Sequence, residues 1–216
     1  MATRTPPRRP EPPTTVLFVR HGRTATTGTT LPGRAPGLHL SEAGRAQAEA
    51  AADRIGALPR VDAVYSSPLE RTRETAAPIG RARHLRVRID RGLLECDFGE
   101  WTGQPLKELT KRKEWATIQR YPSGFRFPGG ESFPEMQGRL TATVAKLVAR
   151  HPGGTLVLVS HADPIKAAVA AALGTHLDLF QRIVVSPCSV TTVAYGATGP
   201  TVLAVNSVPL TELAPS

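Results

Sequence analysis

Two histidines follow short apolar runs, at positions where an α/β protein is expected to bind its ligand. Arg20-His21-Gly22 comes directly after the apolar run at residues 16–19, and Ser160-His161 closes a second apolar run at residues 156–159. In an open α/β sheet, ligands bind beyond the carboxyl ends of the strands. An arginine and a histidine at that place suit an anion. A second histidine at another strand end predicts that the two imidazoles share one site.

The elements that must position these residues alternate between strand and helix patterns. The period of the apolar residues predicts strands at 15–20, 63–65, 85–89 and 155–160, and a closing hairpin at 189–195 and 201–205. Together with capping residues and helix-breaking Pro and Gly, it predicts helices at 41–58, 68–79, 105–119, 131–150 and 165–173. The alternation predicts an α/β fold, a three-layer α/β/α sandwich with a mainly parallel sheet.

Two helix starts carry particular signals. Ser67 and Glu70 have the spacing of a capping box, with Pro68 at the first helical position between them. Asp163-Pro164 predicts a capped start for the helix that follows the second histidine. Both helices would begin close to the strand ends, where their first backbone N–H groups could face an anion.

The 216-residue length predicts one domain, which we expect to cover residues 14–210. Residues 1–13 form a basic, proline-rich stretch that is typical of a disordered tail, and residues 211–216 are expected to form a second tail. No apolar run is long enough to span a bilayer, and no secretion signal is recognisable, so a cytoplasmic location is expected. Cys96 and Cys188 lack the spacing of a metal site, and no metal is expected.

The net charge of +9, with an isoelectric point near 10.4, raises nucleic-acid binding as an alternative. The excess consists mainly of arginines spread along the chain, and at residues 85–89 they alternate with apolar residues at a period of two. That alternation is typical of a strand with one solvated face. Aromatic residues make up only 5% of the chain, so stacking platforms for bases are scarce. A small-molecule substrate is therefore favoured over nucleic acid or a membrane.

Four motifs in order make the chain resemble the histidine phosphatase superfamily, in its phosphoglycerate-mutase-like branch, over nearly all of residues 15–206. They are Val-Arg-His-Gly-Arg-Thr at 19–24, Ser-Ser-Pro-Leu-Glu-Arg-Thr at 66–72, Leu-Glu at 94–95 with Phe-Gly-Glu-Trp-Thr-Gly at 98–103, and Val-Ser-His at 159–161. The resemblance implies a phosphoglycerate mutase-like fold. Within the family, the chain is most similar to a subgroup whose members are often labelled putative phosphomutases.

Three residues are candidates for the chemistry of phosphoryl transfer. His21 is expected to attack phosphorus and form a phosphohistidine, which divides one difficult substitution into two easier ones. His161 is expected to stabilise charge on the phosphoryl oxygens. Glu95 is the candidate proton donor to the leaving oxygen, and then the base that activates water. The resemblance implies the same assignment for His21.

Five further residues are candidates for binding the substrate. Arg20 and Arg71 would each present a planar fork of donors to phosphate oxygens. Ala162 could offer a backbone N–H at the start of a helix. Thr27 and Gly33 are implied only by their correspondence to pocket residues of the family.

The expected activity is that of a metal-independent phosphomonoester hydrolase of the histidine acid phosphatase type, without a cofactor, acting on a small phosphorylated metabolite. His161 lies only 66 positions after Glu95, so the longer insertion that encloses the bisphosphorylated intermediate of family mutases is missing. A phosphoglycerate mutase-type phosphomutase is the alternative, and a basic scaffold with an inactive phosphatase fold is a further one. The substrate and the oligomeric state stay open, with a homodimer among the possibilities.

Two departures from the family pattern bear on the substrate. Arg23 stands where relatives usually carry Glu or Gln, and Ala162-Asp163 replaces a more frequent Gly-Gly. The first departure adds positive charge beside the expected pocket, which favours an acidic or multiply charged substrate.

Overall fold

A six-stranded mixed sheet forms the centre of the molecule in the computed structural model, which describes residues 12–209. Its strands are β1 (Thr14–Arg20), β2 (Ala63–Ser66), β3 (Val87–Ile89), β4 (Thr155–Ser160), β5 (Val190–Gly196) and β6 (Gly199–Ser207), in the order β3-β2-β4-β1-β5-β6. The first four strands of that order run parallel, and β5 and β6 are antiparallel to their neighbours. The prediction of a mainly parallel α/β sheet is confirmed.

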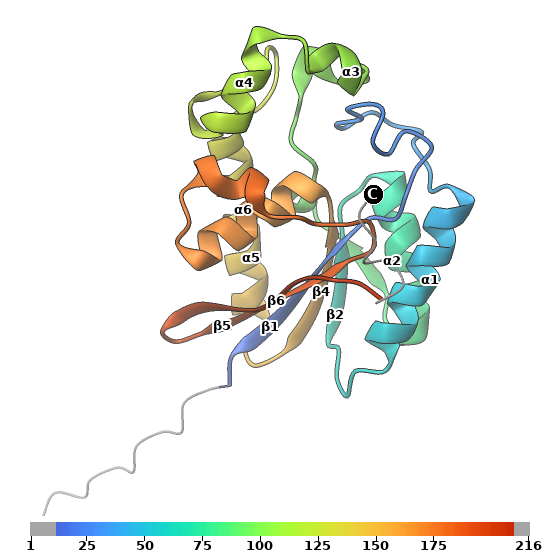
Figure 1. Ribbon diagram of the computed structural model, residues 1–216. Helices are drawn as coiled ribbons and strands as arrows, with labels where there is room; N and C mark the ends of the chain where they lie inside the picture. The colour runs from blue at the N-terminus through green and yellow to red at the C-terminus, as the bar shows by residue number, and fades with distance from the viewer. Residues whose placement is uncertain (1–11, 210–216) are drawn as a thin grey trace, which may run out of the picture.

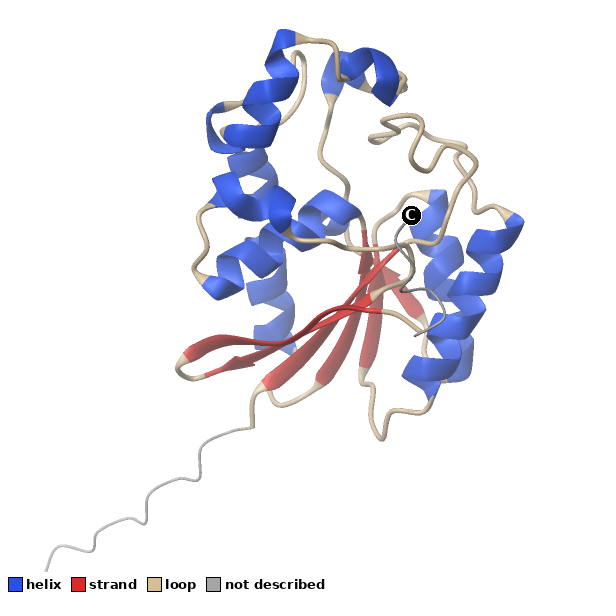
Figure 2. Ribbon diagram, viewed as in Figure 1, coloured by secondary structure: helices blue, strands red, loops and turns tan. Residues whose placement is uncertain are grey.

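Helices cover both faces of the sheet (Figures 1 and 2). One face carries α1 (Glu42–Gly56) and α2 (Glu70–Ala82), and the other carries α5 (Phe133–Arg150) and α6 (Ala162–Leu173). Strand β1 shows why two helical layers are needed. Val16 and Phe18 pack in the core beneath α5 and α6, whereas Leu17 and Val19 pack in the core beneath α1 and α2. A strand that is apolar at every position must bury both of its faces.

The short helices α3 (Leu106–Leu109) and α4 (Lys113–Arg120) lie beyond the carboxyl ends of the parallel strands (Figure 1). They replace the single helix predicted at 105–119. An aromatic core supports this region, with Phe127 in ring contact with Phe98, Trp101, Phe125 and Phe133. Because Phe98 and Trp101 closely follow Glu95 in the chain, this core fixes the segment that carries the candidate acid.

Both predicted caps near the strand ends are wrong. Helix α2 begins at Glu70 rather than at Pro68, and its N-cap Leu69 supplies no side-chain hydrogen bond. Ser67 does not cap the helix, because it is fully buried and its hydroxyl contacts His161. Helix α6 begins at Ala162, three residues earlier than predicted, with His161 as its N-cap.

The predicted start of α6 failed because Asp163 and Pro164 lie inside the first turn. Proline is tolerated there, because an N–H group in the first turn would have no hydrogen-bond acceptor within the helix. The predicted closing hairpin is present as β5 and β6, and the predicted helix at 131–150 is present as α5 with a capping box between Ser132 and Glu135.

The predicted tails lie mostly outside the described residues, which exclude 1–11 and 210–216. Within residues 12–209, no helix combines the length and apolar character needed to cross a membrane.

Candidate active site

The two candidate histidines emerge side by side because their strands are neighbours. Strands β1 and β4 pair in parallel, with Arg20 opposite Ser160, so the next residue of each strand leaves the sheet at the same edge. The rings of His21 and His161 lie 5.2 Å apart, measured between their centroids, and are inclined by 63°. The backbone N–H of His21 donates to the Ser160 carbonyl at 3.0 Å, which ties the two strand ends together.

The hydrogen bonds of His21 assign its tautomer. Its Nδ1 lies 2.8 Å from the Gly22 carbonyl oxygen, which can only accept, so Nδ1 carries the proton. Its Nε2 accepts from Arg71 Nε at 3.3 Å. Burial lowers the pKa of His21 well below its ordinary value, and the charges of Arg71 and Arg20 lower it further. At neutral pH the imidazole is therefore uncharged, with a lone pair on Nε2.

Two arginines whose charges act on His21 carry donors that the described residues leave unpaired. Arg71 is fully buried and donates through Nη2 to the Gly33 carbonyl at 2.7 Å, while its Nη1 has no acceptor among residues 12–209. Arg20 donates through Nη1 to the Val185 carbonyl at 2.7 Å, and its buried Nε is similarly unpaired within the described chain. Buried polar atoms without partners are rare, and cationic ones near a histidine pair suit an anionic ligand.

His161 is held from one side by Ser67. Its Nε2 lies 2.9 Å from Ser67 Oγ, and its buried Nδ1 has no partner in the described part of the chain. If the hydroxyl donates, Nδ1 carries the proton and can donate to a ligand oxygen. Burial lowers the pKa of His161 well below its ordinary value, and Arg71 and His21 contribute in the same direction. Ala162 follows as the first residue of α6, where backbone N–H groups lack helical acceptors.

Glu95 lies in the loop between the 3-10 helix at Arg91–Leu93 and the one at Gly99–Trp101. Its carboxylate oxygen Oε1 accepts from the N–H of Cys96 at 2.9 Å. Burial and the negative charge of Asp163 raise the pKa of Glu95 to about 7, although the Cys96 hydrogen bond and the charges of Arg71 and Arg20 act in the opposite direction. Such a carboxyl can give or take a proton near neutral pH.

The two residues implied only by the family pattern have different surroundings. The Gly33 carbonyl accepts from Arg71, and its backbone has a φ of +50°, a conformation that favours glycine. Thr27 accepts a hydrogen bond from the N–H of Thr24 through Oγ1 at 2.9 Å, within its own loop. Gly33 thus contacts the arginine–histidine cluster directly, whereas the recorded contacts of Thr27 organise the loop.

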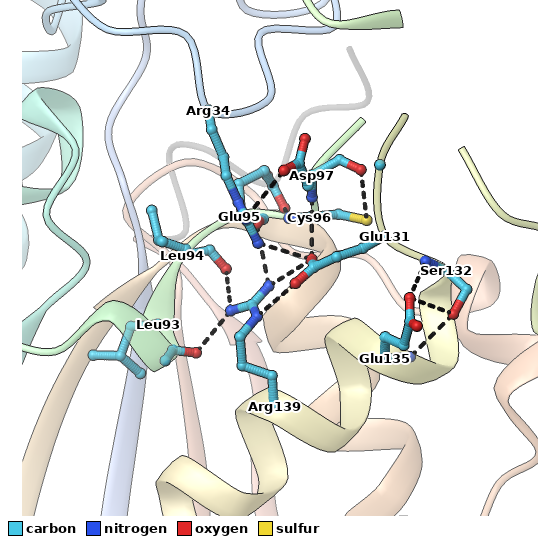
Figure 3. A network of polar contacts seen from close by, with 12 residues as sticks. Arg34, Leu93, Leu94, Glu95, Cys96, Asp97, Glu131, Ser132, Glu135 and Arg139 are labelled. Atoms are coloured by element: carbon cyan, nitrogen blue, oxygen red, sulfur yellow. Dashed lines mark hydrogen bonds and ion pairs between the residues drawn. The ribbon is translucent and has the colours of Figure 1, made fainter. Parts of the chain in front are cut away.

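Several residues around the site had no functional assignment from sequence. They are Ser67, which contacts His161; Asp163, whose charge acts on Glu95; and Arg34, Glu131 and Arg139, which surround the loop of Glu95 (Figure 3). The Ser-Ser-Pro pattern contains Ser67, but its spacing to Glu70 predicts a helix cap and not a contact with His161. The arginine and glutamate contacts join segments up to about a hundred residues apart, and no local pattern predicts them.

An apolar pocket of about 430 Å³ lies elsewhere, between α5, α6 and the β5–β6 hairpin. It is lined mainly by alanine, valine, glycine and proline, with Tyr195 as its one titratable side chain. The chemistry-bearing cluster is instead the one at the carboxyl ends of β1 and β4.

Solved structures and curated sequences resemble this chain over most of its length. It is 33% identical over 178 residues to phosphoserine phosphatase 1 of Hydrogenobacter thermophilus, covering 76% of this chain and 79% of that protein. A mycobacterial glucosyl-3-phosphoglycerate phosphatase superposes with a TM-score of 0.81 at 27% identity, covering 90% and 99% of the two chains. Phosphoserine phosphatase of Entamoeba histolytica, solved in complex with phosphoserine, gives 0.81 at 25% identity, covering 90% and 97%.

The chain spans about half the length, 52%, of three further mycobacterial relatives that are 32% identical to it. The sequence model of the histidine phosphatase superfamily (branch 1) matches residues 16–208, which is almost the whole of the described structure. With its two strand-end histidines and their arginines, the chain belongs to branch 1 of the histidine phosphatase superfamily.

Proposed function

We propose that this phosphatase hydrolyses small phosphomonoesters through a covalent phosphohistidine at His21. The observation that carries the proposal is the state of His21: a buried, uncharged imidazole whose Nδ1 proton is engaged by Gly22 and whose Nε2 lies beside Arg71. A nitrogen nucleophile needs an unprotonated lone pair and a neighbouring group that can hold the electrophile. His21 Nε2 is unprotonated, and the Arg71 Nε–H that contacts it at 3.3 Å would turn to a phosphoryl oxygen when substrate binds.

In the first step, His21 Nε2 attacks phosphorus, and the bond from phosphorus to the ester oxygen breaks. Arg20 and Arg71 balance the charge on the phosphoryl oxygens, together with His161 Nδ1 and the N–H of Ala162. Glu95 transfers its proton to the leaving oxygen, so the alcohol departs neutral. The products of this step are the alcohol, a phosphohistidine and an ionised Glu95.

In the second step, water attacks the same phosphorus. The ionised Glu95 accepts a proton from the water while the bond from phosphorus to His21 breaks. Inorganic phosphate is released, and both residues return to their starting state. A pKa near 7 suits a carboxyl that must act first as an acid and then as a base.

The substrate class is inferred from the charge around the site. Arg23 lies exposed two positions after His21 in the chain, and its charge acts on Arg20. The relatives named above are phosphatases of phosphoserine and of glucosyl-3-phosphoglycerate, each of which carries a carboxylate besides its phosphate. We infer a small phosphomonoester with a further negative group. Thr27 is retained as a pocket residue on the family pattern.

The test compares hydrolysis with phosphoryl transfer. Purified enzyme in excess EDTA is assayed on a chromogenic monoester and on phosphoserine, and its mutase turnover is measured on phosphoglycerate primed with the bisphosphate. Hydrolysis that continues in EDTA and exceeds mutase turnover supports the proposal. Mutase turnover that outpaces hydrolysis, or activity that EDTA abolishes, contradicts it.

A further inference from the structure

The backbone of the Glu95 loop is held by two arginines from opposite sides (Figure 3). Arg34 Nε donates to the Glu95 carbonyl at 2.9 Å, and Arg139 Nη2 donates to the same oxygen at 3.2 Å. Arg139, on α5, also donates through Nη1 to the carbonyls of Gly92 and Leu94, each at 2.9 Å. Each of these carbonyls thus accepts a hydrogen bond from a charged donor, and such bonds are stronger than those between neutral groups.

Glu131 joins the two arginines. It forms a two-pronged pair with Arg139, with Nε–Oε1 and Nη2–Oε2 distances of 2.9 Å, and an ion pair with Arg34 Nη2 at 2.8 Å. Its Oε2 also accepts from the N–H of Asp97 at 3.1 Å. Burial opposes ionisation of this carboxyl, but the contacts with Arg139 and Asp97 and the charge of Arg34 lower its pKa, so it stays charged.

Arg34 and Arg139 lie in different parts of the fold. Arg34 lies in the loop between β1 and α1, directly after Gly33, whose carbonyl accepts from the phosphate-binding candidate Arg71. Two consecutive residues therefore contact the two halves of the site. The Gly33 carbonyl fixes Arg71 beside His21, and the Arg34 side chain fixes the backbone of Glu95.

The position of the Glu95 carboxyl depends on that backbone. Within residues 12–209, the recorded hydrogen bond of the carboxyl comes from the N–H of the adjacent Cys96. The carboxyl therefore moves with its own loop, and a shift of about 1 Å at a reacting group can cost about a hundredfold in rate.

We propose that Arg34 is a positioning residue, which sets the Glu95 carboxyl at the distance from the Arg71–His21 pair that proton transfer to the leaving oxygen requires. The inference rests on the proposed role of Glu95. It predicts a defect in the acid-assisted step rather than a general loss of structure or of phosphate binding.

Leaving groups of different basicity separate these effects. The value of kcat/KM is measured on phenyl phosphate, whose leaving oxygen needs a proton, and on 2,4-dinitrophenyl phosphate, whose leaving oxygen does not. Because kcat/KM reports the steps up to the first bond cleavage, slow hydrolysis of a phosphoenzyme does not obscure the comparison. For Arg34→Ala we expect a loss of at least about tenfold on phenyl phosphate and of less than about threefold on the dinitrophenyl ester.

Three variants complete the design. Arg34 also contacts the Asp97 carboxylate through Nη1 at 3.3 Å. Arg34→Lys keeps one charge but cannot span the Glu95 carbonyl and the carboxylates of Glu131 and Asp97, so an intermediate loss is expected. Arg126→Ala removes an exposed arginine that pairs with Glu135, and both substrates should stay within about twofold of the wild type. Glu95→Gln removes the proposed proton donor itself, so its loss of kcat/KM should differ most between phenyl phosphate and the dinitrophenyl ester.

Equal losses of Arg34→Ala on the two substrates, or no loss on either, would overturn the positioning role. If Glu95→Gln shows no dependence on the leaving group, the proposed role of Glu95 fails, and the inference about Arg34 fails with it. If the loss in Glu95→Gln depends on the leaving group but the loss in Arg34→Ala does not, the inference about Arg34 fails while the proposed role of Glu95 stands. Thermal melting of each variant checks that the compared proteins are folded.

Discussion

At the scale of single residues, burial sets the charge states of the ionisable side chains in the candidate site. The same desolvation keeps His21 uncharged and keeps a proton on Glu95, because it penalises the charged form of each group. Arg71 and Arg20 act against the protonated form of His21 but favour the ionised form of Glu95. A neutral His21 and a protonated Glu95 thus coexist over a window of pH.

This window predicts the pH profile of kcat/KM. The raised pKa of Glu95 means that its proton is present below about pH 7 and lost above it, so activity should fall as the pH rises through that value. The lowered pKa of His21 places the acid limb well below pH 6.5. Asp163→Asn removes a negative charge that favours the protonated form of Glu95, so the basic limb should move to lower pH.

Lys166→Gln is the matched control, since it removes the cation 3.5 Å from Asp163 and leaves the aspartate charge in place. Its basic limb should stay at the wild-type position or move to higher pH. A basic limb that is unchanged in Asp163→Asn would contradict the assignment of that limb to Glu95.

At this scale the sequence named the residues that are proposed to react, but not the residues that contact and hold them. A strand-end histidine after an apolar run is readable, because the strand and its end are local patterns. The contact of Ser67 with His161 joins residues 94 positions apart, and that of Arg34 with Glu95 joins residues 61 apart. Such contacts follow from the fold and not from spacing in the chain.

At the scale of elements, the turn after His21 is fixed by its close approach to α1. A Cβ atom on Gly22 would lie 2.5 Å from the Gly44 carbonyl oxygen, and one on Gly44 would lie 2.0 Å from the Arg23 carbonyl oxygen. These distances leave no room for a side chain. The N–H of Gly22 donates to Thr75 Oγ1 on α2 at 3.0 Å, so both helices of this face help to position His21.

Gly44→Ala should therefore destabilise the protein and lower its activity. The added methyl group must push α1 away from the turn, at a cost of about 1–3 kcal/mol, and His21 shifts with the turn. Gly138→Ala is the matched control, because Gly138 is also helical and a Cβ atom there meets nothing within 4 Å. It should stabilise α5 by about 0.5–1 kcal/mol and leave kcat/KM unchanged. Urea denaturation and steady-state kinetics measure both effects, and equal behaviour of the two variants would refute the account.

At the scale of the whole molecule, the sequence predicted the layers but not the order of the strands. Alternating patterns indicated a parallel sheet with helices on both faces. The insertion of β4 between β1 and β2, which brings His161 next to His21, joins strands more than a hundred residues apart in sequence. The two strand-end histidines predicted a shared site, but not that their strands are neighbours, because periodicity carries no information on which strands pair.

The net charge of +9 also acts at this scale, since it attracts anionic substrates from solution. For a dianionic monoester, kcat/KM should fall several-fold between about 20 and about 200 mM NaCl while kcat stays nearly constant, because salt screens the attraction. Duplex DNA and RNA added as competitors should leave the rate unchanged. Inhibition by nucleic acid with a steep salt dependence would instead favour the basic surface as a binding site in its own right.

The central claim is that the phosphoryl group is carried by His21, and a trapped intermediate tests it most directly. Enzyme mixed with a radiolabelled monoester is quenched within one turnover in alkali, where phosphohistidine is stable, and the label is mapped by mass spectrometry. The account predicts label on His21, lost on acid treatment and missing from a folded His21→Ala variant that no longer turns over substrate. Label on another residue, or full turnover by His21→Ala, would contradict it.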